Sequence, residues 1–242
     1  MQYSTFAAID IGSYDVILEI FEISKKQGIR SVDKICHRME LGKDTYTLGK
    51  IRPEMEEELC RVLADFVRIM EGYRVDDYRA TASSAISEAS NSLYVLGKIH
   101  QLTGLSVTVL SNSEQRFLSY KALAAMEDNF NKIIEKGTAI LDLDGGSFQI
   151  SLFDKDALVT TQNIRMGSLR IRERLAGIQS ETEHYEEMVE ELIWNEVSSF
   201  KKMYLKDRKI ENIMLIGDVF TDSVYQNIEE KTTKIISREN FN

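Results

Sequence analysis

Residues Ala139–Phe153 read AILDLDGGSFQISLF, and this stretch decides the fold expected for the chain. An apolar run ends on Asp142 and Asp144, the turn Gly145-Gly146-Ser147 follows, and an apolar strand then resumes. The pattern predicts a β-hairpin whose turn lets a ligand approach the backbone, because glycine has no Cβ and consecutive turn amides can point at one anion. Carboxylates beside such a turn suit a hard cation with oxygen ligands. An ordinary Gly-Gly hairpin is the alternative that the stretch alone leaves open.

A second copy of this hairpin lies near the N-terminus. Asp10–Phe21 aligns without a gap on Asp142–Phe153, and the aspartate and the phenylalanine of each copy coincide. Internal repetition of a whole supersecondary unit is a fold-level signal, because both units must solve the same packing problem. We therefore expect two like domains, residues 1–127 and 128–242, that face each other across a phosphate-binding cleft.

The composition indicates a soluble globular protein and a cytoplasmic location. The 242 residues are 43% hydrophobic and 29% charged, which gives ample material for a core. No apolar run approaches the roughly 20 residues needed to span a membrane, so no membrane association is expected. The N-terminus lacks the layout of a signal peptide, and Cys36 and Cys60 are expected to be reduced thiols.

The formal net charge of −9 restricts the partners of the protein. An acidic surface repels DNA, RNA and long polyanions, so nucleic-acid binding is not expected. Any phosphate ligand must therefore be small and held by a local site, together with a divalent cation.

The first half predicts the order β-β-β-α-β-α-β-α. Strands are expected at residues 5–9, 16–23, 29–39, 77–82 and 106–110. A polar loop is expected after 40–44, and helices over 53–72, over 85–101 and from Ser111. The last of these helices opens with Ser111-Asn-Ser-Glu114, which has the form of a capping box.

The second half starts the same order again. Strands are expected at 138–143, 147–153, 157–165 and 213–216, with a long helix around 181–204 and another after Asp218. The chain ends before the remaining strand and helix of the repeat, so we expect a repeat that is either trimmed or naturally cut short.

Six segments occur in order along most of the chain: 8–13, 38–42, 80–91, 110–120, 142–147 and 166–170. With them the sequence resembles the exopolyphosphatase / guanosine pentaphosphate phosphohydrolase (Ppx/GppA) family, within the actin–hexokinase–Hsp70 superfamily. The resemblance implies an α/β fold of two ribonuclease-H-like domains, each with a mixed five-stranded sheet flanked by helices, and a cleft between them. It also implies a possible homodimer, since relatives are often dimers.

The resemblance further implies chemistry and site residues. The family cleaves terminal phosphates from polyphosphate or pppGpp with water and a divalent cation, usually Mg²⁺, with Mn²⁺ as the alternative. Asp10 and Asp142 match its metal-side carboxylates. Asp144 either joins them in an oxygen-rich metal site or closes the loop to phosphate. The phosphate-binding candidates are Gly12, Ser13, Arg38, Ser84, Gly145, Gly146, Ser147 and Arg170.

The chain departs from the family pattern at positions that bear on catalysis. The glutamate usually taken as the catalytic base falls on Gln115, and Ser87 and Gln149 replace an arginine and a glutamate. An amide cannot accept a proton from water, but glutamine can orient an attacking water. Glu114 is the obvious replacement, although adjacent helical residues point about 100° apart. Its other role is to cap the helix through Ser111.

The leading hypothesis is therefore metal-dependent hydrolysis of terminal phosphoanhydrides in short polyphosphate or a guanosine polyphosphate. Water is the nucleophile, Gln115 or Glu114 places it, and the motif substitutions attenuate the activity. The rival hypothesis is a catalytically weakened sensor that binds phosphate or a guanosine polyphosphate. A sugar kinase or chaperone that uses ATP is a third possibility, although Gly217-Asp-Val-Phe offers little as a nucleotide-binding loop.

Overall fold

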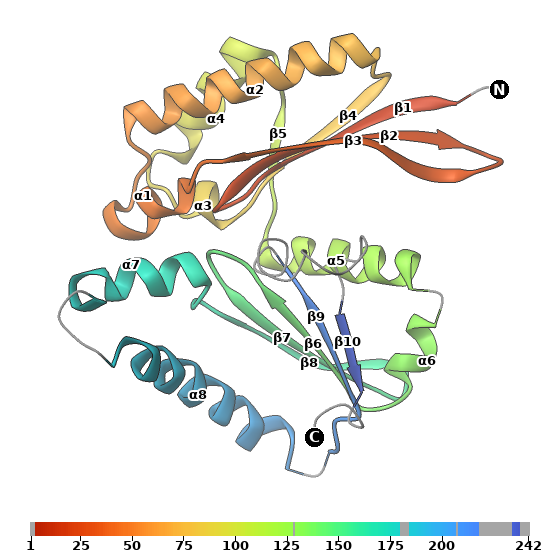
Figure 1. The fold of residues 1–242 in the computed structure, drawn as a ribbon, viewed down its shortest axis with the longest axis vertical. Helices are drawn as coiled ribbons and strands as arrows, with labels where there is room; N and C mark the ends of the chain where they lie inside the picture. Colours follow the sequence, from red (N-terminus) through yellow and green to blue (C-terminus); the bar gives the residue numbers. More distant parts are fainter. Residues whose placement is uncertain (1–2, 128, 180–183, 207, 218–233, 238–242) are drawn as a thin grey trace. The chain divides into compact units, whose positions relative to one another are not determined.

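The computed structural model describes residues 3–127, 129–179, 184–206, 208–217 and 234–237 (Figure 1). The chain divides into two compact units, Met1–Gln115 and Arg116–Asn242. The boundary lies inside helix α5 (Asn112–Met126), and most of this helix belongs to the second unit. The domain bounds 1–127 and 128–242 stay a prediction.

The first unit is built on a mixed five-stranded sheet. Its strands are β1 (Ser4–Ile11), β2 (Asp15–Ser24), β3 (Gly28–Arg38), β4 (Asp77–Ala82) and β5 (Val107–Val109), in the order β3-β2-β1-β4-β5. The first three strands pair antiparallel, as consecutive hairpins do, whereas β4 and β5 run parallel to β1 after helical crossovers.

Four helices belong to this sheet, namely α1 (Leu41–Leu48), α2 (Pro53–Tyr73), α3 (Ser84–Ser87) and α4 (Ser92–Thr103). Helix α2 starts with proline at its first position, where a missing N–H costs nothing. Helices α2 and α4 cover one face of the sheet (Figure 1). The apolar core of this unit includes Ile9, Leu18, Leu59, Leu63, Phe66 and Ile99.

Strand β3 forms an edge of the first sheet, and most of its side chains are exposed. Ile29 is 71% exposed, and charged residues such as Arg30 and Lys34 follow it. The pairing of β2 with β3 shifts register between Ile20 and Phe21, because Val32 is an extra residue that forms a bulge in the edge strand itself.

The second unit repeats the strand order of the first. Its strands are β6 (Thr138–Leu143), β7 (Phe148–Asp154), β8 (Ala157–Ile164), β9 (Asn212–Ile216) and β10 (Lys234–Ser237), in the order β10-β9-β6-β7-β8. As in the first sheet, the first three strands pair antiparallel and the next one runs parallel to the first. Strand β10 differs from β5 because it pairs antiparallel with its neighbour.

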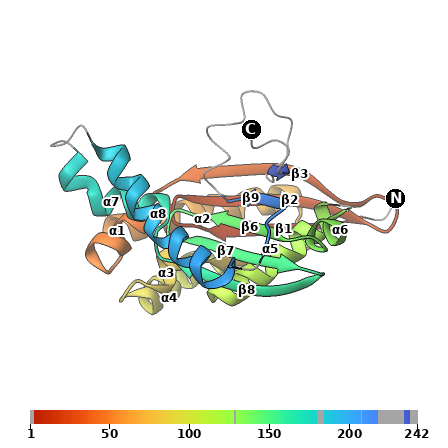
Figure 2. The same cartoon turned by 90° about the horizontal axis from the view of Figure 1, so that it is seen from below.

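Helices cover both faces of the second sheet (Figures 1 and 2). They are α5 (Asn112–Met126), α6 (Phe130–Ile134), α7 (Ser168–Gln179) and α8 (Tyr185–Tyr204). One core cluster joins α5 and α6 to the sheet and includes Leu123, Phe130, Ile140 and Phe153. A separate cluster lies on the α8 side and includes Ile150, Leu152, Phe200 and Met166.

The structure confirms the predicted fold class, with a mixed five-stranded sheet flanked by helices in each unit. Several local predictions are wrong. The expected polar loop after 40–44 is helix α1, and helices α6 and α7 were not predicted. The repeat was expected to stop before a fifth strand, but β10 occupies the fifth position. The helix expected after Asp218 lies outside the described residues.

The helix expected over 85–101 is broken into α3 and α4 at Glu88–Asn91. Asn91 explains the break, because its side chain binds a distant segment. Its Oδ1 accepts from the N–H of Ile51 at 3.0 Å, and its Nδ2 donates to the carbonyl of Ile51 at 2.8 Å. These two hydrogen bonds to the backbone of Ile51 take the place of the continuous helix that was predicted over 85–101.

Candidate functional site

The first candidate turn, Gly12–Tyr14, connects β1 to β2. The N–H of Gly12 donates to the carbonyl of Asp15 at 2.9 Å and closes the turn. A Cβ on Gly12 would lie 2.9 Å from that same oxygen, so only glycine fits the closed turn without a shift.

Asp10 lies at the end of β1, directly before this turn. Its side chain is accessible to water, yet its reduced hydration raises the carboxyl pKa to about 6, and a hydrogen bond from Thr81 partly offsets the effect. The hydroxyl of Thr81 donates to Oδ1 of Asp10 at 3.4 Å. The raised pKa marks a carboxylate whose negative charge the surrounding protein does not fully compensate.

Three hydroxyl groups from three separate elements meet beside the first turn. Ser13 comes from the turn, Tyr46 from α1, and Ser84 from the start of α3. The Tyr46 Oη lies 2.7 Å from the Ser13 Oγ and 2.8 Å from the Ser84 Oγ, while the two serine oxygens are 3.4 Å apart. Ser13 is only 3% exposed. The structure therefore brings together the predicted residues Ser13 and Ser84, through a tyrosine that sequence reasoning missed.

Helix α1 is attached to the first turn by backbone hydrogen bonds. The N–H groups of Met39 and Glu40 both donate to the carbonyl of Tyr14, and the N–H of Gly42 donates to the carbonyl of Ser13, each at 2.9 Å. Glu40 adopts a left-handed conformation with φ 52°, which turns the chain from β3 into the helix.

Arg38, a predicted phosphate ligand, lies over the ring of Tyr14. Its guanidinium carbon is 4.8 Å from the ring centroid, within the range of a cation–π contact. Its Nη2 also lies 3.9 Å from Oε1 of Glu40, and about half of the arginine side chain is exposed. Arg38 is therefore placed at the first turn with a guanidinium that is already in contact with protein groups.

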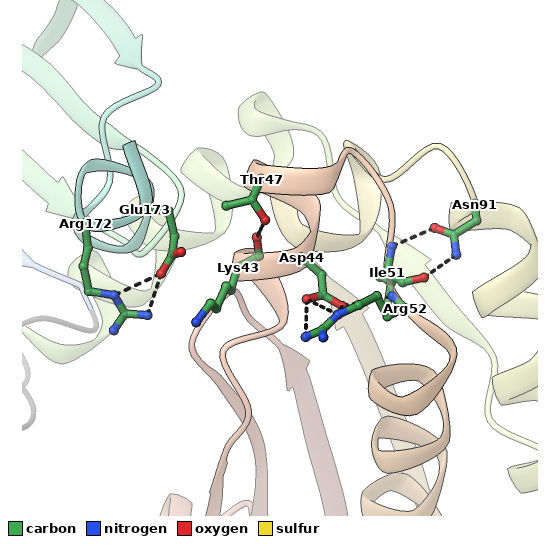
Figure 3. Close-up of polar contacts among 8 residues, drawn as sticks. All are labelled: Lys43, Asp44, Thr47, Ile51, Arg52, Asn91, Arg172 and Glu173. Carbon is green, nitrogen blue, oxygen red and sulfur yellow. Dashed lines mark hydrogen bonds and ion pairs between the residues drawn. The ribbon is translucent and has the colours of Figure 1, made fainter. Parts of the chain in front are cut away.

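A buried carboxylate in the first helical turn of α1 fixes this helix (Figure 3). Asp44 accepts hydrogen bonds from the backbone N–H and the Nε of Arg52, and Nη2 of Arg52 lies 2.8 Å from its Oδ1. The Asp44 side chain is 2% exposed and that of Arg52 is 51% exposed. Next to this pair, Asn91 holds the backbone of Ile51 (Figure 3). These contacts fix α1, and with it Tyr46, relative to α2 and α4.

The second candidate turn, Asp144–Ser147, connects β6 to β7 and is held by backbone contacts. The N–H of Asp144 donates to the carbonyl of Ser147 at 3.0 Å, and the N–H of Ser168 donates to the carbonyl of Asp144 at 3.2 Å. Arg170 binds the turn twice: its N–H donates to the carbonyl of Gly145 at 3.1 Å, and its Nε donates to the carbonyl of Gly146 at 2.9 Å. Arg170 therefore supports the second turn. Its predicted role as a phosphate ligand stays a prediction.

Gly167 allows this close approach. A Cβ at this position would lie 2.4 Å from the backbone oxygens of Asp144 and Gly145. Such a distance is impossible for a real side chain, so glycine is required where the segment before α7 crosses the turn. The other two glycines of the site, Gly145 and Gly146, are buried in the turn itself.

Asp142 lies at the end of β6, as Asp10 does at the end of β1. Burial raises its carboxyl pKa to about 6, and a hydrogen bond from Ser119 on α5 partly offsets this. In the β6–β7 pair Asp142 is directly opposite Gln149, the position where the family resemblance implies a glutamate. An amide there adds no second negative charge beside a carboxylate that is already poorly hydrated.

Glu114 takes the capping role that the sequence left open. Its Oε2 accepts from the N–H of Ser111 at 2.9 Å and from the hydroxyl of Ser111 at 2.8 Å, while its own N–H donates to that hydroxyl at 3.2 Å. These bonds to Ser111 lower the pKa of Glu114. Its neighbour Gln115 is half-buried in the first turn of α5.

The predicted metal ligands are divided between the two units, with Asp10 in the first and Asp142 and Asp144 in the second. Among the described residues, no group of three or more His, Cys, Asp or Glu is placed to hold a metal ion. Nor does any helix in the described part of the chain have the length and apolar character to cross a membrane.

Two sheets of one strand order, each with an aspartate at the end of its first strand and a tight turn after it, give the chain a fold of the actin–hexokinase–Hsp70 type. The chain belongs to the Ppx/GppA phosphatase family, whose model matches residues 19–242.

Individual relatives are distant. A bifunctional 3-dehydroquinate synthase/phosphatase of Fusobacterium nucleatum is 22% identical over 238 residues, which cover 93% of this chain and 34% of that protein. Exopolyphosphatase 1 of Mycobacterium leprae is 25% identical over 144 residues, covering 59% of this chain and 41% of the relative. The chain thus spans about a third to two fifths of the length of these relatives.

A solved structure supports the fold. The crystal structure of an exopolyphosphatase from Cytophaga hutchinsonii is similar with a TM-score of 0.75 at 20% identity, covering 88% of this chain and 66% of that one. At this identity the likeness concerns the fold, while the details of the two turns come from this chain's own residues.

Proposed function

We propose that the protein hydrolyses terminal phosphoanhydride bonds of a small phosphorylated substrate, a short polyphosphate or a guanosine polyphosphate. The observation that carries the proposal is the duplicated aspartate turn. Asp10 and Asp142 end the equivalent strands of the two sheets, and both carboxyl groups have a pKa raised to about 6. Poorly compensated carboxylates beside glycine-containing turns suit a site that receives a cation and an anion together.

A divalent cation, Mg²⁺ or Mn²⁺, fits this donor set. Magnesium is usually bound by one or two carboxylates plus substrate phosphates and water, so a cluster of three protein ligands is not required. Asp142 and Asp144 would hold the cation on the second unit and Asp10 on the first. The bound cation supplies neutralisation of phosphate charge. The turns at Gly12–Ser13 and Gly145–Ser147, with Ser84, would hold the phosphate oxygens.

Water is the nucleophile in this proposal, and Gln115 is the residue that orients it. Glu114 is the weaker candidate, because its carboxylate already accepts two hydrogen bonds from Ser111 and its lowered pKa makes it a poorer base. Phosphoryl transfer depends mainly on positioning and charge stabilisation, so glutamine can still support turnover. Losing a general base costs roughly 10²–10⁴ in rate, and we therefore expect a slow enzyme.

The rival function, a phosphate or guanosine-polyphosphate sensor, is favoured by two observations. Gln115 stands where a base is expected, and the Nε of Arg170 is bonded to Gly146 of its own turn. In a sensor the ligand binds with similar strength but is not cleaved. We further propose a cytoplasmic homodimer, for which the support is the family resemblance, and sedimentation of the purified protein tests the dimer.

The decisive experiment measures phosphate release from tripolyphosphate and from pppGpp with Mg²⁺ or Mn²⁺. Asp142→Asn and Asp10→Asn should each lower turnover by roughly 100-fold or more, as loss of charge stabilisation typically does. If both turns act on one substrate, the double variant should be little worse than the poorer single variant. Asp156→Asn is the matched control, because Asp156 is exposed and has a positive φ that asparagine tolerates.

Each alternative gives a distinct result in this assay. Binding of tripolyphosphate without release, with release gained in Gln115→Glu, supports the sensor. Release that is unchanged in Asp142→Asn contradicts the proposed hydrolase site. Release that falls equally in Asp156→Asn points to a general effect of charge.

A further inference from the structure

The hydroxyl groups of Ser13, Tyr46 and Ser84 form a cluster whose protons can be counted. The two contacts of the Tyr46 oxygen, 2.7 and 2.8 Å, have the length of good O–H···O hydrogen bonds. The 3.4 Å separation of the serine oxygens is beyond that range. Tyr46 has one proton, so it donates across at most one of its two short contacts and accepts across at least one.

Either oxygen of each short contact can be the donor, and burial distinguishes the two serines. Ser13 is 3% exposed, whereas Ser84 is half-buried and can be reached by a ligand. One arrangement has Ser13 as donor to Tyr46 and Tyr46 as donor to Ser84. In that order the Ser84 hydroxyl accepts within the cluster, and its own proton is available to a ligand.

We propose that Tyr46 is a positioning residue, which links Ser13 to Ser84 in a hydrogen-bond relay and directs the Ser84 proton to a phosphate oxygen of the ligand. The proposal deepens the function proposed above and rests on phosphate binding at the first turn. A chain of hydrogen bonds polarises its members, so the last hydroxyl is a better donor than an isolated serine. An anionic acceptor at the end of the chain completes it.

Helix α1 is held firmly enough for this role. Thr45, next to Tyr46, donates from its buried hydroxyl to the carbonyl of Ala85 at 2.6 Å, which ties α1 to the start of α3. The N–H of Gly42 binds the carbonyl of Ser13 at the other side. Helix α1 is thus attached to both of the segments that carry the serine partners of Tyr46. Tyr46 already lies within hydrogen-bond distance of both serines.

The relay predicts a ranked series of affinities for tripolyphosphate with Mg²⁺, measured by isothermal titration calorimetry. Ser84→Ala removes the donor itself and should weaken binding about 10-fold, the size of one charge-assisted hydrogen bond. Tyr46→Phe removes the residue that directs the donor and should weaken binding about 3- to 5-fold. Ser13→Ala acts at the remote end and should have the smallest effect.

Non-additivity separates a relay from a merely structural tyrosine. Tyr46→Phe should add nothing in the Ser84→Ala background, because no donor is left to direct. In turnover, Tyr46→Phe should raise KM and leave kcat nearly unchanged, as loss of uniform binding does. Tyr73→Phe is the matched control: it also removes one tyrosine hydroxyl from the first unit, one that donates to Asp33 at 2.8 Å.

The possible results have separate meanings. Equal affinity of wild type and Tyr46→Phe overturns the relay and leaves the proposed function standing, as do additive losses in the double variant. Wild-type protein that neither binds nor cleaves tripolyphosphate or pppGpp overturns the proposed function and the relay with it. If Tyr46→Phe does not fold, Ser13→Ala in the Ser84→Ala background replaces it. The relay then requires no further loss of affinity.

Discussion

The turn after β1 and the turn after β6 occupy the same place in two sheets of the same strand order, but they are supported by different parts of the chain. The first is held by the segment that leads into α1, through backbone bonds to Ser13 and Tyr14, and also by the side-chain hydroxyl groups of Tyr46 and Ser84. The second is held by backbone bonds to the segment that starts α7, through Gly167 and Arg170. Repetition of a strand order thus conserves where an aspartate is placed, while the loops that support it are built independently.

The largest effect is expected where the second turn depends on close backbone contact. Gly167→Ala places a Cβ within 2.4 Å of Asp144 and Gly145, so the turn must move. We expect a loss of about 3 kcal/mol in the free energy of unfolding, as for other forced overpacking. Urea denaturation measures it.

The control for this variant is Gly177→Ala in α7, where a Cβ meets nothing within 4 Å. It should raise the free energy of unfolding by about 0.5–1 kcal/mol, because alanine favours the helix. Equal stability of Gly167→Ala and wild type would mean that the second turn is not fixed by this approach.

A smaller effect is expected where the first turn depends on α1. Asp44→Ala leaves the backbone N–H and the guanidinium of Arg52 without their buried acceptor. We expect a loss of about 2 kcal/mol, below the range for a fully buried pair because half of the Arg52 side chain is exposed. Chemical denaturation again gives the value.

Asp65→Ala is the matched control for Asp44→Ala. It removes the carboxylate of an ion pair with Arg68 in which both side chains are mostly exposed. Such a pair contributes only about 0–1 kcal/mol. If the two variants lose equal stability, Asp44 does not anchor α1.

The smallest effect concerns the cap of α5, the helix that brings Ser119 to Asp142. Bonds to Ser111 lower the pKa of Glu114 in the folded protein, so its carboxylate stabilises the fold above the unfolded pKa. That stabilisation is lost as the pH falls through the folded pKa. Glu114→Ala should therefore lower Tm at pH 7, and the difference should disappear once the pH is below the folded pKa of Glu114. Glu191→Ala, an exposed residue within α8, should show no such pH dependence.

The contrast between the turns also explains what the sequence could predict. The two aspartates were predictable, because an ungapped repeat fixes their place at the ends of equivalent strands. The cap of α5 was predictable because Ser111 and Glu114 are three residues apart. Tyr46 was not, since it meets its serine partners across 33 and 38 residues of chain, a distance at which no local pattern operates.

Helix α1 shows why the surroundings of the first turn were harder to predict from the sequence than those of the second. Its sequence, LGKDTYTL, contains glycine and two threonines, which have low helix propensity, so a polar loop was the natural expectation. Tertiary contacts override that preference, among them the buried pair of Asp44 and Arg52. For Arg170 the motif predicted phosphate binding, which stays a prediction, and its bonds to the backbone of the second turn depend on how the chain crosses that turn.

The exposed edge of β3 has a consequence for the behaviour of the protein in concentrated solution. An open edge offers unpaired N–H and C=O groups to a strand of any neighbouring chain. The charged side chains of Arg30 and Lys34 and the bulge at Val32 make such pairing costly. Replacing these two charges by apolar residues would make β3, with its exposed Ile29, an edge strand that pairs with other chains and promotes aggregation.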